Sequence, residues 1–222
     1  MKPFLIFIAC LVGLDTVAQT GVFVNEKGEK YTEFDYKMSS ESLIKNKYKG
    51  SIYWKDTLTL GRFSVAGGDT VAKLVLLDLL NQQFLVHFED NTRAITNTNL
   101  TLDGHHFVCI KGRFYEPLSV GKVKVLVHHS CVLKEYAKGY KDGLPESLDN
   151  DFRGEVVRKK DFYLLFPNHK LRPIQLTDYS VSLALVRHYE SIEWHIEQFG
   201  KKINNEADVI QLLHFLEVRG VF

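Results

Sequence analysis

The sequence lacks the short motifs that mark the common enzyme classes. It contains no Gly-x-Ser-x-Gly elbow, no His-Glu-x-x-His helix, no glycine-rich phosphate loop and no dinucleotide fingerprint. Each of these motifs sets a nucleophile, a metal ligand or a phosphate-binding backbone at fixed spacing. We therefore expect no catalytic residue and no cofactor, and a non-enzymatic role is the preferred interpretation. A hydrolase with a site assembled from distant residues is the weaker alternative.

The chain also lacks an excess of charge of either sign. Its 28 Lys and Arg residues are balanced by 27 Asp and Glu residues, for a formal net charge of +1. The two signs are mixed along the chain, without the basic stripe that follows a nucleic-acid backbone. A nucleic-acid partner is therefore not expected.

Long apolar runs are missing except at the N-terminus. There, Lys2 precedes a run of about ten apolar residues, a length typical of a secretory signal peptide. Thr16 and Ala18 are small residues at the positions that a signal peptidase reads, which predicts a signal peptide over residues 1–18 that is cut after Ala18. The run is too short to span a bilayer as a helix, which takes roughly 20 residues. We expect an exported protein that is periplasmic or outer-membrane-associated, either free or lipid-anchored through Cys10.

After the signal peptide, short runs with a two-residue period alternate with turn residues. Residues 83–90 show the pattern best: alternate side chains there belong to opposite faces, with Phe84, Val86 and Phe88 on one face and Leu85, His87 and Glu89 on the other. Gly, Asn and Asp separate such runs. The pattern predicts an antiparallel β-rich domain over residues 19–176, built as a meander, a sandwich or a half-barrel.

Other segments of this domain carry weaker signals. Residues 122–136 alternate most clearly and predict a long strand, whereas residues 31–38 fit an edge strand. Residues 45–50 are basic, which favours a surface loop. We interpret residues 113–117 as a turn, because Pro117 has no N–H to donate to a central strand ladder.

The last part of the chain, residues 177–222, has helical periodicity. Asp178 can cap a first helix, and a second helix over residues 190–199 ends at Gly200. A third helix begins at Asn205, with Asp208 as a variant of the capping box. Its buried stripe consists of Val209, Leu212, Leu213 and Leu216. The overall fold class is therefore α+β, with a small helical segment packed on the β-rich body.

Several segments together resemble a family of uncharacterised secreted proteins from Bacteroidetes. The segments are Gly50–Trp54, the strand–Gly-Gly-Asp–strand unit at Gly61–Val71, Leu74–Asp78, Gln83–Asp90, Lys160–Leu165 and Glu206–Leu213. The resemblance implies a location in the cell envelope and this type of fold, and it implies no catalytic activity.

One group of residues could bind a metal. His105 and Cys109 share one face of a predicted strand, and His129 and Cys131 share one face of another. If the two strands paired, these four side chains could converge on zinc or copper. Two alternatives stay open. Cys109 and Cys131 could form a disulfide that closes a loop of about 20 residues and contributes roughly 3 kcal/mol, or both could be buried reduced thiols.

The preferred function is a non-enzymatic protein-binding or structural module of the cell envelope, whose partner is another envelope protein. Pairing through an edge strand is one way in which such a module recognises its partner. The alternative is a protein that binds a small ligand or a metal through the His/Cys group or an aromatic-rich sheet face. The aromatic residues concerned are Tyr31, Phe34, Tyr36, Tyr48, Tyr53 and Trp54.

Overall fold

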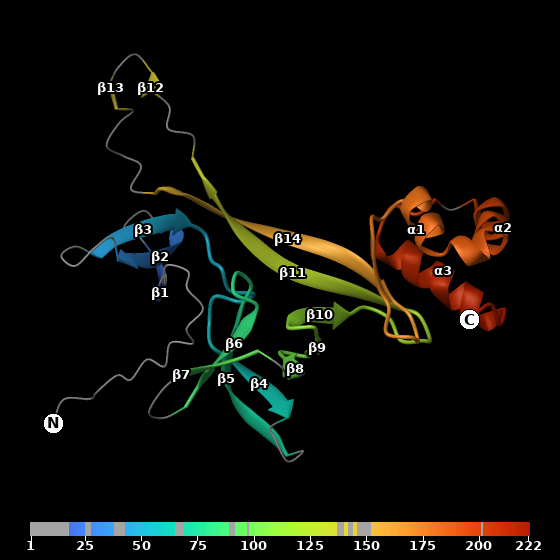
Figure 1. Cartoon of the computed structure of the whole chain (residues 1–222), viewed down its shortest axis with the longest axis horizontal. Coiled ribbons are helices and arrows are strands. Elements are labelled where there is room, and N and C mark those ends of the chain that lie inside the picture. Colours follow the sequence, from blue (N-terminus) through green and yellow to red (C-terminus); the bar gives the residue numbers. More distant parts are fainter. Residues whose placement is uncertain are drawn as a thin grey trace. The chain divides into compact units, whose positions relative to one another are not determined.

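The computed structural model describes residues 18–24, 28–37, 43–64, 69–88, 92–96, 98–136, 140–141, 144–145, 152–200 and 202–222. The predicted signal peptide up to residue 17, including Cys10, lies outside these residues. The described residues form a mainly antiparallel mixed sheet followed by three helices towards the C-terminus (Figure 1). The predicted fold class, an antiparallel β-rich body with a C-terminal helical segment, is confirmed.

The chain forms two compact units. The first consists of Met1–Thr59, Leu74–Ala94 and Cys131–Arg158, and the second of Leu60–Lys73, Ile95–Ser130 and Lys159–Phe222.

The strands in chain order are β1 (Ala18–Val24), β2 (Lys30–Lys37), β3 (Leu43–Lys49), β4 (Thr59–Ser64), β5 (Thr70–Asp78), β6 (Gln83–His87), β7 (Thr92–Ile95), β8 (Leu100–Leu102), β9 (His105–Ile110), β10 (Arg113–Pro117), β11 (Lys124–Glu135), β12 (Tyr140–Lys141), β13 (Leu144–Pro145), β14 (Gly154–Leu165) and β15 (Leu171–Ile174).

In the first unit, β2 lies between β1 and β3 and pairs antiparallel with both. The start of β14 then pairs parallel with β3, where Gly154 lies opposite Tyr48. Two expectations were therefore wrong: the segment predicted as an edge strand over residues 31–38 lies inside the sheet as far as it is described (31–37, in β2), and residues 45–49 of the predicted loop 45–50 belong to β3. The lysines of β3 alternate with Ile44, Asn46 and the buried Tyr48, which is the period of a strand.

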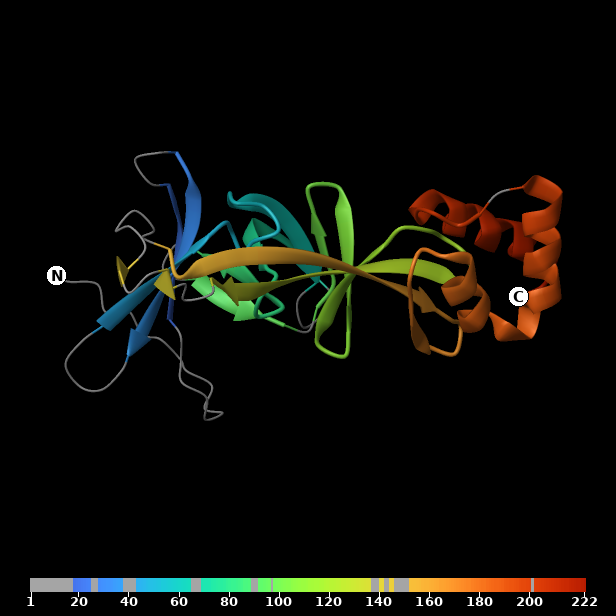
Figure 2. The ribbon, with the colours of Figure 1, turned by 90° about the horizontal axis from the view of Figure 1, so that it is seen from above.

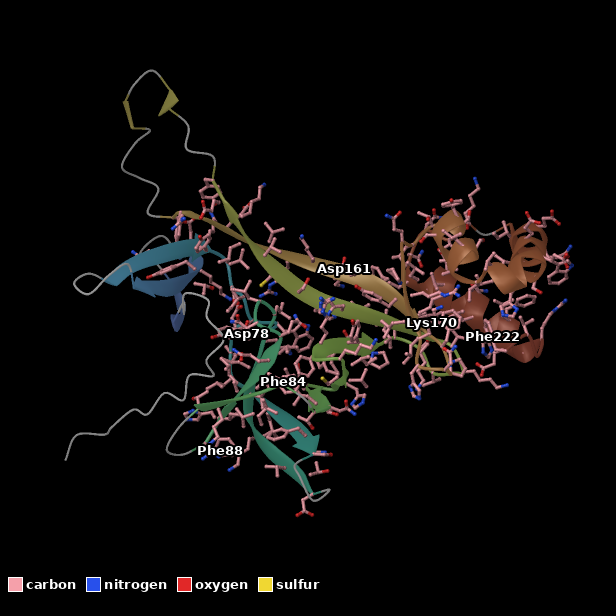
Figure 3. The ribbon with its side chains drawn as sticks, in the orientation of Figure 1. Asp78, Phe84, Phe88, Asp161, Lys170 and Phe222 are labelled. Atoms are coloured by element: carbon pink, nitrogen blue, oxygen red, sulfur yellow. The ribbon has the colours of Figure 1, made fainter. Side chains whose placement is uncertain are left out.

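The β5–β6 hairpin supplies apolar side chains to the core of the first unit. Phe84 and Val86 are fully buried, whereas His87 is exposed, as the alternation predicts. At the turn, the Asp78 carboxylate accepts hydrogen bonds from the backbone N–H groups of Leu80 and Asn81 at 3.0 Å each. Asp78 is fully buried at the end of β5 (Figure 3), so its role is to fix this turn.

In the second unit, β4, β8, β9, β10 and the first part of β11 pair antiparallel in that order. Residues 113–117 are therefore a central strand, β10, and their interpretation as a turn was wrong. The Leu118 N–H donates to the Val125 carbonyl (2.8 Å), so the position of the missing Pro117 N–H faces away from β11, by alternation. The Pro117 nitrogen faces β9 instead, but the pairing between β9 and β10 ends at Tyr115 and does not reach Pro117. Pro117 thus removes no hydrogen bond from the registered ladders.

Three helices cover the apolar core of the second unit: α1 (Asp178–Ala184), α2 (Tyr189–Phe199), which follows the short 3₁₀ turn η1 (Val186–His188), and α3 (Glu206–Val218). Both views show the helices gathered beside the β14–β15 hairpin (Figures 1 and 2). The core combines strand and helix residues: Val123, Val125, Leu164, Ile174, Val181, Leu185, Ile192, Ile203, Val209, Leu212, Leu213 and Leu216. The predicted buried stripe of α3 is confirmed.

The helix ends follow the sequence signals except at α1. Gly200 ends α2 with φ = 60°, a left-handed conformation that glycine adopts at little cost. The Asn205 side chain accepts the N–H of Asp208 at 3.1 Å and caps α3 as predicted. At α1, however, the cap is Thr177, because the Asp178 carboxylate instead accepts the Ile203 N–H at 2.6 Å.

Among the described residues, no helix has both the length and the apolar character needed to cross a membrane.

Candidate functional site

Three neighbouring strands of the second unit place two histidines and a glutamate on one face of the sheet. Tyr115 of β10 lies opposite Val108 of β9 and His128 of β11. One residue further, Glu116 belongs to the opposite face. His105 and His129 stand diagonally across from it on the two flanking strands. We call His105, Glu116 and His129 the His–Glu–His cluster.

Each imidazole of the cluster contacts a different oxygen of the carboxylate. His105 Nδ1 lies 2.5 Å from Glu116 Oε1, and His129 Nε2 lies 2.8 Å from Glu116 Oε2. The Glu116 and His129 side chains are 15% and 13% exposed, whereas His105 is 46% exposed. Solvent therefore reaches the cluster from the His105 side.

The environment of Glu116 stabilises its charged form. The hydrogen bond from His129 is the main reason why the pKa of the Glu116 carboxyl lies below its ordinary value. Burial opposes this effect, and the hydrogen bond from His105 adds to it. Glu116 is accordingly a carboxylate with both oxygens engaged at neutral pH.

The four predicted metal ligands do not lie on two directly paired strands, as the sequence analysis assumed. β9 and β11 do not pair with each other, because β10 lies between them. His105 and His129 nevertheless meet, through the carboxylate of Glu116. The Cys109 thiol donates to the Thr96 carbonyl at 3.2 Å.

Cys131 belongs to the first unit, where it is buried and its Sγ lies 3.9 Å from the Ile52 carbonyl oxygen. Burial raises the pKa of this thiol to about 12. Both Cys109 and Cys131 are free thiols. The described residues contain no group of three or more His, Cys, Asp or Glu side chains arranged to hold a metal ion. The metal site at His105, Cys109, His129 and Cys131 stays a prediction, as does the alternative disulfide.

Sequence reasoning missed Glu116 because Pro117 suggested a turn. A better signal precedes the strand: Lys111 and Gly112 form the two-residue turn between β9 and β10, with φ values of 52° and 74°. Two consecutive positive φ values are typical of a type I′ hairpin turn, and a Gly at its second position favours one. The Lys-Gly pair after a strand therefore indicates that residues 113–117 return as a partner strand.

The opposite face of these strands is structural. His128 is buried, and its Nδ1 lies 3.0 Å from the Phe114 carbonyl oxygen. Burial is the main reason why the pKa of His128 is lowered. Its ring packs 5.1 Å from that of Tyr115, which in turn meets Tyr163 edge-on at 5.4 Å. A neutral imidazole enclosed by aromatic rings stabilises the core and presents no site.

A second candidate site is an open groove between β14, β15 and α1, which we call the β15–α1 groove. Its volume is about 680 Å³, and its lining includes Phe162, Tyr163, Pro173, Ile174, Tyr179 and Leu183, together with Lys160, Asp161, Gln175 and Ser180. Asp161 projects from β14 (Figure 3). On the helix side, Tyr179 is 78% and Leu183 60% exposed. These two residues are four apart and therefore share one face of α1.

The edge of β15 is closed to strand addition. Within the described residues β15 pairs with β14 alone. The Phe166 N–H donates to the Lys170 carbonyl (3.0 Å), which sets the alternation and turns the backbone nitrogens of Pro173 and Gln175 away from β14. Pro173 has no N–H, and the Gln175 N–H donates to the Ser180 hydroxyl at 2.8 Å. Docking at this place therefore uses side chains and not the strand edge.

Comparison with known proteins adds no relative to this description. No family model matches the chain, no curated protein matches it, and no solved structure matches it.

Proposed function

We propose that the chain is an exported, non-enzymatic binding module of the cell envelope, and that it holds another envelope protein in the β15–α1 groove. The observation that carries the proposal is the exposure of Tyr179 and Leu183 beside an open, aromatic-lined groove. Large apolar side chains grouped on a surface favour an interaction site. Tyrosine is also among the residues that contribute most to binding energy at protein interfaces.

Export is supported by the N-terminal sequence. The apolar run after Lys2 and the small residues Thr16 and Ala18 fit a cleaved signal peptide. Mass spectrometry of the protein recovered from its producing cells tests this part. The proposal expects a mature N-terminus at Gln19, and an intact residue 1 or a lipid on Cys10 would contradict it.

The lining of the groove fits a protein partner better than a metabolite. The groove is open, and it combines aromatic rings with one lysine and one aspartate at neighbouring positions, Lys160 and Asp161. Small-molecule sites enclose most of their ligand. A partner side chain inserted against Phe162 and Tyr179 would bury apolar area while Lys160 and Asp161 form a polar rim.

The test compares two substitutions of exposed apolar residues in the second unit. Leu183→Asp places a charge in the groove, and Val218→Asp places the same charge on α3, where Val218 is 73% exposed and does not line the groove. Each tagged protein is purified gently from its own envelope fraction, and co-purifying proteins are quantified by mass spectrometry. Circular dichroism verifies that both variants fold.

We expect a defined partner with the wild type and with Val218→Asp. Leu183→Asp should reduce that partner by about thirtyfold, the effect of losing a contact of roughly 2 kcal/mol. Equal recovery with both variants would refute the groove as the docking site. Turnover of a substrate that one side-chain substitution abolishes would refute the non-enzymatic role.

Binding of a metal or a small ligand is the second candidate function. It is favoured by the meeting of His105 and His129 on one carboxylate, because imidazole is the commonest side-chain ligand of transition metals. The test is the zinc and copper content of the purified protein and of the variants His105→Ala and His129→Ala. Metal that both substitutions remove would support this candidate, and equal metal content in all three proteins would reject it.

A further inference from the structure

The free edge of β1 differs from the other strand edges of the described chain. β7 and β15 each have four residues, and they carry Arg93 and Pro173. β1 has seven residues, Ala-Gln-Thr-Gly-Val-Phe-Val, and the six that follow the proposed cleavage site after Ala18 include no charged side chain and no proline. Charges, prolines and shortness are the usual means by which an edge strand is protected from pairing. β1 has none of them.

The pairing of β2 with its two neighbours determines which backbone groups of β1 face away from β2. The Gly50 N–H donates to the Lys30 carbonyl at 2.8 Å, so Lys30 directs its backbone towards β3. The next residue, Tyr31, then directs its backbone towards β1, where it pairs with Phe23. Phe23 is therefore bonded to β2.

By the same alternation, Val22 and Val24 turn their N–H and C=O groups away from β2. Within the described residues β1 pairs with β2 alone. Unpaired backbone groups in an extended row are satisfied best by another strand. The edge at Val22–Val24 thus has the hydrogen-bonding geometry that a further strand would match.

We infer that this strand is β1 of a second copy of the chain, which pairs antiparallel about a two-fold axis at Phe23. In that register Val22 lies opposite Val24 of the second copy, and each such pair exchanges both of its backbone hydrogen bonds. Phe23 lies opposite Phe23 of the second copy, and aromatic pairs stabilise such positions. Because Val22, Phe23 and Val24 have uncharged side chains, self-pairing brings no like charges together at the axis.

Self-pairing is favoured over pairing with an arbitrary strand by symmetry. An isologous contact uses the same patch twice, so one exposed strand edge suffices to form a closed dimer. A contact of one strand pair buries little area, and we expect a dimer that dissociates in the micromolar range. This inference is independent of the β15–α1 groove, which belongs to the other unit.

The test uses a pair of opposite charges at the proposed axis. Phe23→Lys and Phe23→Glu each place like charges opposite one another in the homodimer, whereas a mixture of the two variants places opposite charges there. The proteins are purified with their natural N-terminus and studied by sedimentation velocity at about 1 to 100 μM, the range in which a small interface dissociates. Circular dichroism controls for folding.

We expect wild-type dimers, at least about a tenfold weaker association of each variant alone, and recovery of dimers in the mixture. Val22→Pro is a second variant, because it removes an outward N–H and leaves the bonds of Phe23 to β2 in place; it should also give monomers. A wild type that is monomeric throughout this range would overturn the inference. So would a mixture that associates no better than either variant, or capture of a different protein by the wild-type β1 edge in place of self-association.

Discussion

Asp78 in the first unit and Glu116 in the second are both carboxylates largely removed from water, yet their partners differ. Asp78 accepts hydrogen bonds from groups within five residues of it: backbone N–H groups and the side-chain amides of Asn81 and Gln83. Glu116 is contacted by two imidazoles from neighbouring strands, one of them half exposed. A buried carboxylate with local partners, such as Asp78, fixes a turn. A carboxylate bonded to imidazoles from other strands near the surface, such as Glu116, is instead a candidate binding group.

The two units also differ in how their sheets end. Within the part of the chain that the structure describes, β1 of the first unit pairs on one side only, whereas the second unit closes β15 with Pro173 and the Gln175–Ser180 hydrogen bond. The second unit instead exposes side chains, in the β15–α1 groove. The same chain thus offers backbone groups at one place and side chains at another.

The largest effect is expected from Asp78→Asn. The new amide would turn a donor towards the donors of Asn81 and Gln83, and because position 78 is fully buried, this new donor would be left unpaired at a cost of about 1–3 kcal/mol. We expect a loss of about 3 kcal/mol in the free energy of unfolding, measured by urea denaturation. Asp69→Asn, at an exposed position, is the control and should change stability by less than about 0.5 kcal/mol. If both substitutions lowered the free energy of unfolding equally, Asp78 would not have the structural role that distinguishes it from an exposed carboxylate.

A smaller, pH-dependent loss is expected from Glu116→Gln. The folded-state pKa of Glu116 lies below its ordinary value of 4.5, so the stabilisation by this carboxylate is present above about pH 4.5. It is lost as the pH falls through the folded-state pKa. The variant should lose about 1–3 kcal/mol at pH 7, because it gives up hydrogen bonds to a charged group.

The measurement is urea denaturation of wild type and Glu116→Gln between pH 3 and pH 7, with the exposed Glu193→Gln as the control. The difference between wild type and Glu116→Gln should shrink in acid. A difference that stays constant over this range would mean that the charge of Glu116 contributes nothing.

Pro173→Thr is expected to change association more than stability. Threonine restores an N–H that points away from β14 and removes one of the two features that close the β15 edge, while the Gln175–Ser180 hydrogen bond stays. Stability should change by less than about 1 kcal/mol, while light scattering should detect new, concentration-dependent association. If Pro173→Thr stays as dispersed as the wild type, proline is not what closes this edge.

Thiol labelling compares the two cysteines without changing the fold. Burial raises the pKa of Cys131 to about 12, so its thiolate is scarce at neutral pH, whereas Cys109 is partly exposed. We expect iodoacetamide to label Cys109 in the native protein and Cys131 only after unfolding, as read by peptide mass spectrometry. Resistance of both cysteines until a reductant is added would instead reveal the disulfide.

The parts of the fold that local patterns determine were predictable. The alternation at Phe84 and Val86, the strand β11 and the Asn205 cap of α3 follow from neighbouring residues alone, and the structure confirms them. β10 was missed because the tolerance for Pro117 depends on which side of the strand its nitrogen faces, and only the register of β11 determines that.

The candidate site was predictable only in part. His105 and His129 were identified by residue type, but the carboxylate between them lies on a strand whose place in the sheet depends on long-range pairing. The β15–α1 groove had no sequence signal, because Tyr179 and Leu183 fit a buried helix face as well as an exposed one. Whether these side chains are exposed depends on how α1 packs in the unit, and the sequence of α1 alone does not determine that.

The most direct test of the proposed binding role is site-specific photo-crosslinking in the producing cells. A photoreactive phenylalanine analogue replaces Tyr179 in one variant and Val218 in another, so that both probes sit on exposed helix surfaces of the same unit. The account predicts one defined crosslinked envelope protein from position 179 and none from position 218. The same crosslinks from both positions, or none from 179, would contradict it.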